Sequence, residues 1–183
     1  GLRFVGIPTS QRVADLASAA GIPLPSFGEH RQIDLTVDGA DEVERGTLNL
    51  IKGRGGALLH EKIVARAAAR FIVIVDASKR FDSLSQGGRV PVEVVAFGWR
   101  QTQTAIERLG FQPILRLDPA GAAYVTDNGN RILDVLIDDL RDAANVASRL
   151  KAITGVVEHG LFIGMAETVI VGRDDGSVSR LRR

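Results

Sequence analysis

Residues 51–76 read IKGRGGALLHEKIVARAAARFIVIVD, and this stretch decides the fold. A short apolar run over 48–51 predicts a strand, and the glycine-rich run 53–56 predicts a flexible loop. Residues 57–69 are rich in strong helix formers, so we expect a helix there. Phe71–Val75 is apolar on both faces, as is typical of a central parallel strand covered by helices. This order of elements predicts an α/β fold with a doubly wound, mostly parallel sheet of Rossmann-like type.

The residues before this stretch predict a second unit of the same kind. Residues 2–5 form a short apolar run, and the hydroxyl side chains at 9–10 can cap a helix over 11–20. Apolar and polar side chains alternate over 33–37, up to a tight turn at Asp38–Gly39. We expect this strand, helix and strand to form one crossover unit. The first residues read as the entry to a strand inside a domain, so we also expect a segment to precede them.

The second half of the chain predicts a small α+β module. Asn128 and Gly129 lie between two β-prone runs, 124–126 and 132–135, which indicates a hairpin whose central residues both need positive φ. The remaining patterns predict strands over 90–95, 111–117 and 156–158 and helices over 102–109 and 140–150. This order of elements is typical of a ferredoxin-like fold.

The limits of this module follow from the segments on either side of it. Gln86–Gly88 predicts a flexible break, and the apolar run 167–172 predicts a strand that returns to the first sheet. We therefore expect a Rossmann-like domain over 1–87 and 160–183, with a ferredoxin-like domain over 88–159 inserted into it.

The composition excludes several classes of function. With 183 residues and 45% hydrophobic content, the chain can bury a core as a folded protein. Its 23 basic and 22 acidic residues nearly cancel, so no overall field attracts nucleic acid or an anionic membrane. No apolar run approaches the roughly 20 residues of a membrane span. The absence of cysteine excludes disulfides, thiolate nucleophiles and cysteine-bound zinc, and it fits the cytoplasm.

Polar or glycine-rich turns follow three of the predicted strands. They are Asp38–Glu42, Lys52–Gly56 and Asp76–Lys79. In open α/β sheets, ligands bind in the crevice beyond the carboxyl ends of the strands. We therefore expect these three turns to converge on one site.

The first two turns carry groups suited to acid–base chemistry. Asp38 and Asp41 bracket Gly39–Ala40, which holds two carboxylates close enough to raise one pKa, although acidic turn residues are more often solvated caps. The run Gly53–Gly56 leads into a helix, so its N–H groups can hold an oxyanion or a phosphate, or it is simply a tight turn. It is not a P-loop, because Lys52 precedes the glycines.

Lys52 and Glu61 are the most specific candidate pair of catalytic residues in the sequence. The lysine ends a predicted strand, and the glutamate lies in the first turns of the next helix, so the two charges can face each other. The competing interpretation is that Glu61 and Lys62 are ordinary solvated helix charges. His30, His60 and His159 lack the spacing of metal ligands, so we expect surface or supporting roles for them.

Taken together, these motifs resemble a known family. Seven strings resemble ribose-5-phosphate isomerase A in the same order, over nearly the whole chain: residues 7–10 (IPTS), 36–43 (TVDGADEV), 51–65 (IKGRGGALLHEKIVA), 76–79 (DASK), 90–94 (VPVEV), 125–135 (VTDNGNRILDV) and 156–162 (VVEHGLF).

The resemblance implies an aldose–ketose isomerase that interconverts ribose 5-phosphate and ribulose 5-phosphate through a cis-enediolate, without metal or organic cofactor. It implies that Glu61 is the base that moves a proton between C2 and C1, and that Asp38 and Asp41 contact the sugar hydroxyls. It also implies substrate contacts from Lys52, from the glycine loop, and from Lys79. The implied substrate-binding set is Asp38, Gly39, Ala40, Asp41, Lys52, Gly53, Arg54, Gly55 and Lys79. Relatives of this kind suggest a cytoplasmic homodimer or homotetramer.

The sequence departs from the family pattern in a few places. Arg54 interrupts the glycine run, and His60 stands where the family pattern often has arginine. The family normally begins with a loop rich in glycine, serine and threonine that binds the substrate phosphate, and we find no counterpart here. We therefore expect weak substrate binding by these residues alone.

Two other functions stay open at this point. One is an inactive sugar-phosphate-binding regulatory module of related fold, which would not need both Lys52 and Glu61. The other is a magnesium site formed by Asp38, Asp41 and Glu42, although no phosphoryl-transfer motif accompanies them.

Overall fold

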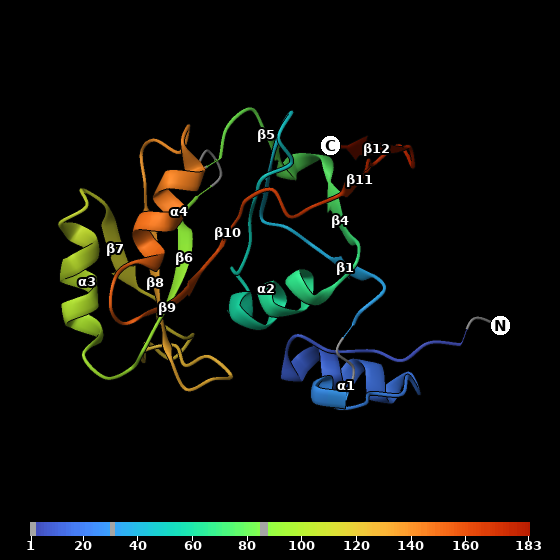
Figure 1. Cartoon of the computed structure of the whole chain (residues 1–183), viewed down its shortest axis with the longest axis horizontal. Coiled ribbons are helices and arrows are strands. Elements are labelled where there is room, and N and C mark those ends of the chain that lie inside the picture. Colours follow the sequence, from blue (N-terminus) through green and yellow to red (C-terminus); the bar gives the residue numbers. More distant parts are fainter. Residues whose placement is uncertain (1–2, 30–31, 85–87) are drawn as a thin grey trace.

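The computed structural model describes residues 3–29, 32–84 and 88–183 and shows a mixed α/β protein (Figure 1). Within these residues the strands form three four-stranded sheets. The predictions made for Leu2, for His30 and for the break at Gln86–Gly87 fall outside the described residues.

The first sheet is mostly parallel, as predicted. β4 lies between β1 and β11 and runs parallel to both, and β12 pairs antiparallel to β11 at the edge. The strands are β1 (Thr36–Asp38), β4 (Phe71–Asp76), β11 (Thr168–Gly172) and β12 (Val178–Arg182). In β4, Phe71 and Val73 are buried, whereas Ile74 on the opposite face is 50% exposed. The described residues therefore cover one face of this strand more fully than the other.

The second sheet is made of short strands in the order β10, β3, β2 and β5. They are β2 (Glu42–Glu44), β3 (Leu50–Ile51), β5 (Arg80–Phe81) and β10 (Leu161–Phe162). β3 is antiparallel to both of its neighbours, so it does not join β4 in one layer as the sequence suggested. Only two residue pairs join β3 to each neighbour, and it belongs to this short sheet rather than to the sheet of β4.

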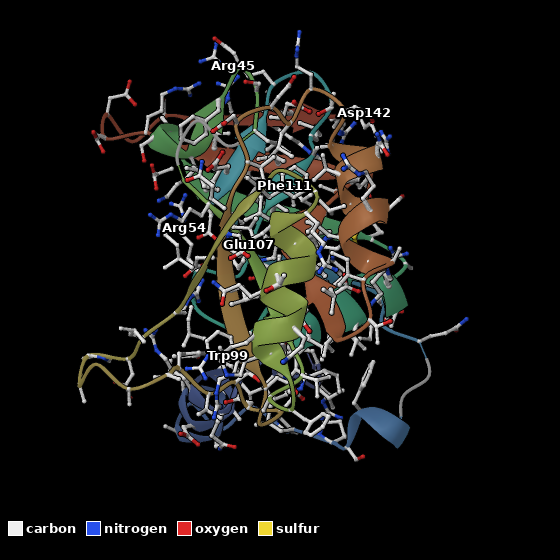
Figure 2. The ribbon with its side chains drawn as sticks, turned by 90° about the vertical axis from the view of Figure 1, so that its left-hand side faces the viewer. Arg45, Arg54, Trp99, Glu107, Phe111 and Asp142 are labelled. Atoms are coloured by element: carbon white, nitrogen blue, oxygen red, sulfur yellow. The ribbon has the colours of Figure 1, made fainter. Side chains whose placement is uncertain are left out.

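The third sheet is the predicted ferredoxin-like unit. Its strands are antiparallel in the order β7, β8, β6 and β9, and helices follow the first and third of them in sequence. The elements are β6 (Val90–Val94), α3 (Trp99–Glu107), β7 (Gln112–Leu115), β8 (Arg131–Leu136), α4 (Ala143–Lys151) and β9 (Val156–His159). Figure 2 shows α3 and α4 side by side in front of the strands, with Trp99 and Glu107 at the two ends of α3.

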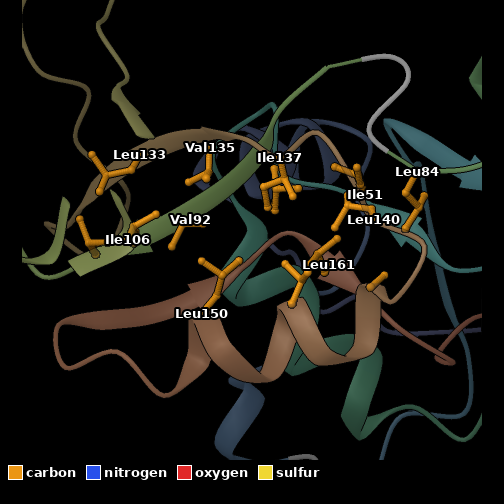
Figure 3. Close-up of a cluster of buried hydrophobic side chains, with 14 residues drawn as sticks. Ile51, Leu84, Val92, Ile106, Leu133, Val135, Ile137, Leu140, Leu150 and Leu161 are labelled. Atoms are coloured by element: carbon orange, nitrogen blue, oxygen red, sulfur yellow. The ribbon is translucent and has the colours of Figure 1, made fainter. Parts of the chain in front are cut away.

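The core of this unit extends into the second sheet. Figure 3 shows Ile51 of β3, Leu84 and Leu161 of β10 packed in one cluster with Leu133 and Leu150 of the ferredoxin-like unit. All five side chains are buried, and each such burial contributes about 1.5–3 kcal/mol. The strand that precedes Lys52 is therefore fixed by packing from both parts of the chain.

Helix α2 (Leu58–Ala67) follows the glycine loop and has close to the predicted length. It lies between the first sheet and the ferredoxin-like unit (Figure 1). On one side the Thr36 hydroxyl donates to the Val64 carbonyl. On the other side Lys62 reaches the Glu158 carboxylate. The start of α2 is therefore held between the first sheet and the ferredoxin-like unit.

The predicted unit at the start of the chain is only partly present. Helix α1 (Gln11–Ala19) begins at Ser10, whose hydroxyl accepts the N–H of Val13, as the capping signal predicted. Residues 3–5 do not form the predicted strand, and α1 buries none of its side chains, with Leu16 61% exposed. The predicted crossover unit was wrong, because without a strand before it α1 has no sheet edge to cross.

The predicted hairpin at Asn128–Gly129 was also wrong. Only Gly129 has positive φ there, and residues 124–126 are not a strand. The side chains of Thr126 and Asn128 turn inward to the buried Glu93, which removes this segment from the sheet. β8 pairs instead with β7.

The short 3₁₀ helices η1 (Phe27–Glu29) and η2 (Ala77–Lys79) complete the described elements. None of the helices in the described ranges combines the length and apolarity that crossing a membrane requires.

Candidate active site

Lys52 stands at the centre of the candidate site, directly after β3. Its N–H donates to the Gly160 carbonyl at 2.9 Å. The backbones approach so closely that a Cβ at position 160 would lie 2.1 Å from the Lys52 carbonyl oxygen, so glycine is required there. The ammonium group lies 5.6 Å from the ring centroid of Phe162 on β10. Lys52 is only 3% exposed, and its charge must therefore be met by neighbouring groups.

Three oxygens meet this ammonium group. Nζ of Lys52 donates to the Gly39 carbonyl at 2.6 Å and lies 2.9 Å from Oδ2 of Asp38. It also lies 3.3 Å from Oε2 of Glu61 on α2. The end of β1 and the start of α2 thus place two carboxylates on one cation. The lysine and glutamate that the sequence singled out face each other.

The two carboxylates keep unused acceptor capacity. Oδ2 of Asp38 and Oε2 of Glu61 are buried, and among the described residues they share the Lys52 ammonium without a further donor of their own. Buried acceptors are nearly always satisfied in folded proteins. These two oxygens can therefore receive hydroxyl groups or a proton from a bound molecule.

Glu61 has a proton affinity suited to a base. Burial raises the pKa of its carboxyl above the ordinary 4.5, the ammonium of Lys52 opposes this shift, and the nearby carboxylates of Asp38 and Asp41 add to it. A carboxylate with a raised pKa accepts a proton more readily near neutral pH.

Asp41 and the glycine loop form the other wall of the site. Oδ2 of Asp41 accepts the N–H of Arg54 at 2.9 Å. The Arg54 side chain turns to the buried carboxylate of Glu42, with 3.2 Å between Nη2 and Oε1, and Figure 2 shows Arg54 on the face turned to the viewer. Gly53 has φ of 103°, and a Cβ there would lie 2.6 Å from Cβ of Leu58. Only glycine lets the loop fold back on the first turn of α2.

Lys79 enters from the third turn. It ends η2, and together with Gly39, Ala40 and Asp76 it lines a cleft of about 470 Å³ beyond the carboxyl ends of β4 and β11. The first turn meets each of the other two, because Gly39 and Ala40 line this cleft and the Gly39 carbonyl also accepts from Lys52, but none of residues 52–56 lines the cleft. Gly55 also lies on the loop, with open space where a side chain would be.

Comparison with known proteins identifies the family. The family profile of ribose 5-phosphate isomerase A (phosphoriboisomerase A) matches residues 5–176. The chain belongs to this family. Ribose-5-phosphate isomerase A of Gluconobacter oxydans is 51% identical over 177 residues, which are 96% of this chain and 77% of that protein. The Synechococcus protein of the same name is 50% identical over 176 residues, 96% of this chain and 76% of that one.

Solved structures agree with the sequence comparison. Ribose 5-phosphate isomerase A from Methanocaldococcus jannaschii has a TM-score of 0.92 and 39% identity, and the match covers 98% of this chain and 78% of that one. A D-ribose-5-phosphate isomerase in complex with phospho-erythronic acid has a TM-score of 0.92 and 40% identity, with the same coverage. The ribose-5-phosphate isomerase A fold is therefore the fold of this chain.

The acidic residues of this family member face different partners. Asp38 meets the Lys52 ammonium, Asp41 accepts the Arg54 N–H, and Glu42 pairs with the Arg54 guanidinium. A magnesium ion needs several oxygens directed at one point. This arrangement does not favour the magnesium site considered from the sequence.

His60 and His159 are next in sequence to Glu61 and Gly160 of the candidate site. Nε2 of His60 is 2.9 Å from Oδ1 of Asn128, and His159 is buried, which lowers its pKa to about 4. These positions are consistent with supporting roles.

Sequence reasoning missed two residues that contact the site. Phe162 lies under Lys52, and Arg116 donates to carbonyls of the glycine loop. The available signal for Arg116 was a cation between Leu115 and Leu117 in an apolar extended run, which suggests a buried partner.

Proposed function

We propose that the chain interconverts D-ribose 5-phosphate and D-ribulose 5-phosphate with Glu61 as the base. Lys52 stabilises the charge on the substrate oxygens, and Asp38 and Asp41 contact the sugar hydroxyls. The observation that carries this proposal is the placement of two buried, partly unsatisfied carboxylates on the ammonium of Lys52. Membership of the ribose 5-phosphate isomerase A family supports the substrate and the reaction class.

The reaction needs one proton to move between neighbouring carbons. Glu61 removes the proton from C2 of the open-chain aldose, and the electron pair forms the C1–C2 double bond while negative charge develops on O1. One proton passes from O2 to O1, and Glu61 then returns its proton to C1 to give the ketose. Because C1 and C2 are adjacent, one carboxylate serves both with a small movement.

The charge on the oxygens decides whether this is feasible. A proton next to a carbonyl is too weakly acidic for an ordinary carboxylate unless the enediolate is stabilised. The Lys52 ammonium supplies that stabilisation from an enclosed position, where a fixed cation acts more strongly than in water. Asp38 and Asp41 contact the sugar hydroxyls and move protons between oxygens.

The remaining contacts come from the three turns. The first turn contributes Gly39 and Ala40, which follow Asp38. The loop contributes Gly53, Arg54 and Gly55. The third turn contributes Lys79, which lines the adjoining cleft. The Lys79 ammonium in this cleft is available to the anionic group of a sugar phosphate. No cofactor is needed for this proton transfer.

An assay with chelator tests the function against the alternatives. We expect conversion of ribose 5-phosphate to ribulose 5-phosphate that persists in EDTA. Strong inhibition by EDTA that added metal reverses would support the magnesium site instead. Stabilisation by ribose 5-phosphate without any product would support a binding-only regulatory module.

We also propose a two-domain organisation, with residues 88–159 inserted into the domain formed by 1–87 and 160–183. The ferredoxin-like strand order of 90–159 supports this division. A cytoplasmic homodimer or homotetramer is proposed from the lack of cysteine and from exposed apolar side chains such as Phe97, which is 93% exposed. Light scattering after size-exclusion chromatography tests the assembly.

A further inference from the structure

Arg116 connects the ferredoxin-like unit to the glycine loop. It follows β7, and its Nε and Nη2 bind the two carboxylate oxygens of Asp134 on β8 at 2.8 and 2.5 Å. The side chain is 14% exposed, and its guanidinium carbon lies 5.8 Å from the ring centroid of Tyr124. A two-pronged pair of this kind fixes the plane of the guanidinium group.

The third nitrogen of the same group is directed at the loop. Nη1 of Arg116 donates to the Gly53 carbonyl at 3.2 Å and to the Arg54 carbonyl at 2.9 Å. From the same part of the chain, the Tyr124 hydroxyl donates to the Gly55 carbonyl at 3.4 Å. Lysine cannot replace these contacts, because it lacks a planar fork that can bind a carboxylate and a carbonyl pair together.

One peptide unit carries the effect of this contact to the site. The carbonyl of Gly53 and the N–H of Arg54 belong to the same peptide group. The carbonyl accepts from Arg116, and the N–H donates to Oδ2 of Asp41 at 2.9 Å. Hydrogen bonds at both ends of a peptide polarise it and strengthen one another. The orientation of this peptide therefore depends on Arg116, and that of the Asp41 carboxylate depends on the peptide.

We propose that Arg116, held by Asp134, is a positioning residue for the isomerase reaction and acts on Asp41 through the Gly53–Arg54 peptide. The inference rests on the proposed function, since it assigns Arg116 a place in that same site. The competing explanation is that the Arg116–Asp134 pair only stabilises the ferredoxin-like unit.

Kinetics of Arg116→Lys and Arg116→Ala test the proposal. We expect kcat to fall about 10- to 100-fold, because small displacements of a positioned group have effects of this size. KM should change much less. Arg149→Ala is the matched control, since Arg149 packs on Phe111 in the same unit and donates to the Leu109 carbonyl, away from the loop. Its kcat should stay within about twofold of the unmodified enzyme, in line with a surface substitution.

Two further measurements separate positioning from stability. Guanidinium ion should partly restore kcat in Arg116→Ala but not in Asp41→Asn. In the double variant Arg116→Ala with Asp41→Asn, the fold decrease in kcat should be much smaller than the product of the two single decreases. Both changes interrupt the same series of contacts from Arg116 to Asp41. Multiplicative losses, or an unchanged kcat in Arg116→Lys, would overturn the inference.

Amide hydrogen exchange keeps this test independent of turnover. In Arg116→Lys the Arg54 amide should exchange about tenfold faster or more, as expected for the loss of roughly 1.4 kcal/mol of protection. Unchanged exchange would reject the inference whatever the assay shows. An unmodified enzyme without isomerase activity would reject the proposed function, and that result is distinct from an active enzyme whose Arg116 variants behave normally.

Discussion

Two buried lysines lie over the same aromatic ring, and we propose a catalytic role for only one of them. The ammonium groups of Lys52 and Lys62 lie 5.6 and 4.8 Å from the centroid of Phe162, and each residue is 3% exposed. Lys62 donates to the Glu158 carboxylate and to the Leu161 carbonyl, both at 3.0 Å, and also to the His159 carbonyl. Lys52 instead is shared between two carboxylates, and the oxygens that face it have no further donor among the described residues.

The difference separates a structural cation, Lys62, from the proposed catalytic one, Lys52. The contacts of Lys62 are nearly all used, and they fix α2 to β9 and β10. The neighbours of Lys52 remain available to a ligand. Glu61 and Lys62 are consecutive on α2, and one step along a helix turns by about 100°, so one residue faces the site while the next anchors the helix.

Replacing Lys52 should give the largest effect on activity. Lys52→Met removes the cation that stabilises the enediolate, so we expect kcat to fall by about 10²–10³ or more. Steady-state assays of ribulose 5-phosphate formation measure this loss. Activity close to that of the unmodified enzyme would show that the charge of Lys52 is not needed.

Replacing Lys62 should affect stability more than chemistry. Lys62→Met leaves two carbonyls without this donor, whereas the Glu158 carboxylate keeps Lys151, so we expect a loss of about 1–3 kcal/mol. Denaturant unfolding measures the change. At temperatures where the variant stays folded, kcat should exceed that of Lys52→Met at least tenfold, and equal losses in the two variants would remove the distinction between the lysines.

The pH dependence should reveal the environment of Glu61. Burial raises the pKa of this carboxyl, and the base must be ionised, so kcat/KM should decline toward acid at a pH above the ordinary glutamate value of 4.5. Asp38→Asn removes a nearby negative charge that raises this pKa. The acid limb should therefore move to lower pH in the variant, and a shift to higher pH would contradict the assignment.

A smaller effect is expected on the stability of the folded protein. Because the pKa of Glu61 is raised on folding, the folded state binds the proton more tightly, and stability is lost as pH rises from the unfolded value through the folded one. Glu61→Gln should therefore be more stable than the unmodified protein at pH 7 by about 0.5–2 kcal/mol. The gain should shrink toward pH 4, as unfolding measured across this range would show.

Much of this arrangement could be predicted because it depends on local patterns. Local patterns of a few residues predicted the strand at Phe71–Val75 and the helix cap at Ser10. A succession of such patterns predicted the ferredoxin-like order of elements. The pair Lys52 and Glu61 followed from a strand end, a short loop and the start of a helix, which leave little freedom in where the two side chains lie.

The parts that could not be predicted depend on contacts between distant segments. Thr126 and Asn128 resembled hairpin residues, but the buried carboxylate of Glu93 draws their side chains inward. Arg116 gave little sign of its role, since its partners Gly53 and Arg54 lie 63 and 62 residues away. Helix α1 satisfied every local rule and still packs on no sheet, because the strand predicted before it does not form.

The most direct test of the account is the turnover of Glu61→Gln measured together with its ligand affinity. Loss of a positioned base typically costs about 10²–10⁴ in rate, so we predict a fall in kcat of that size. The dissociation constant for ribose 5-phosphate, measured by calorimetry on samples at isomerisation equilibrium, should stay within a fewfold of that of the unmodified enzyme. Turnover near the normal rate with ligand binding intact would contradict the claim that Glu61 moves the proton.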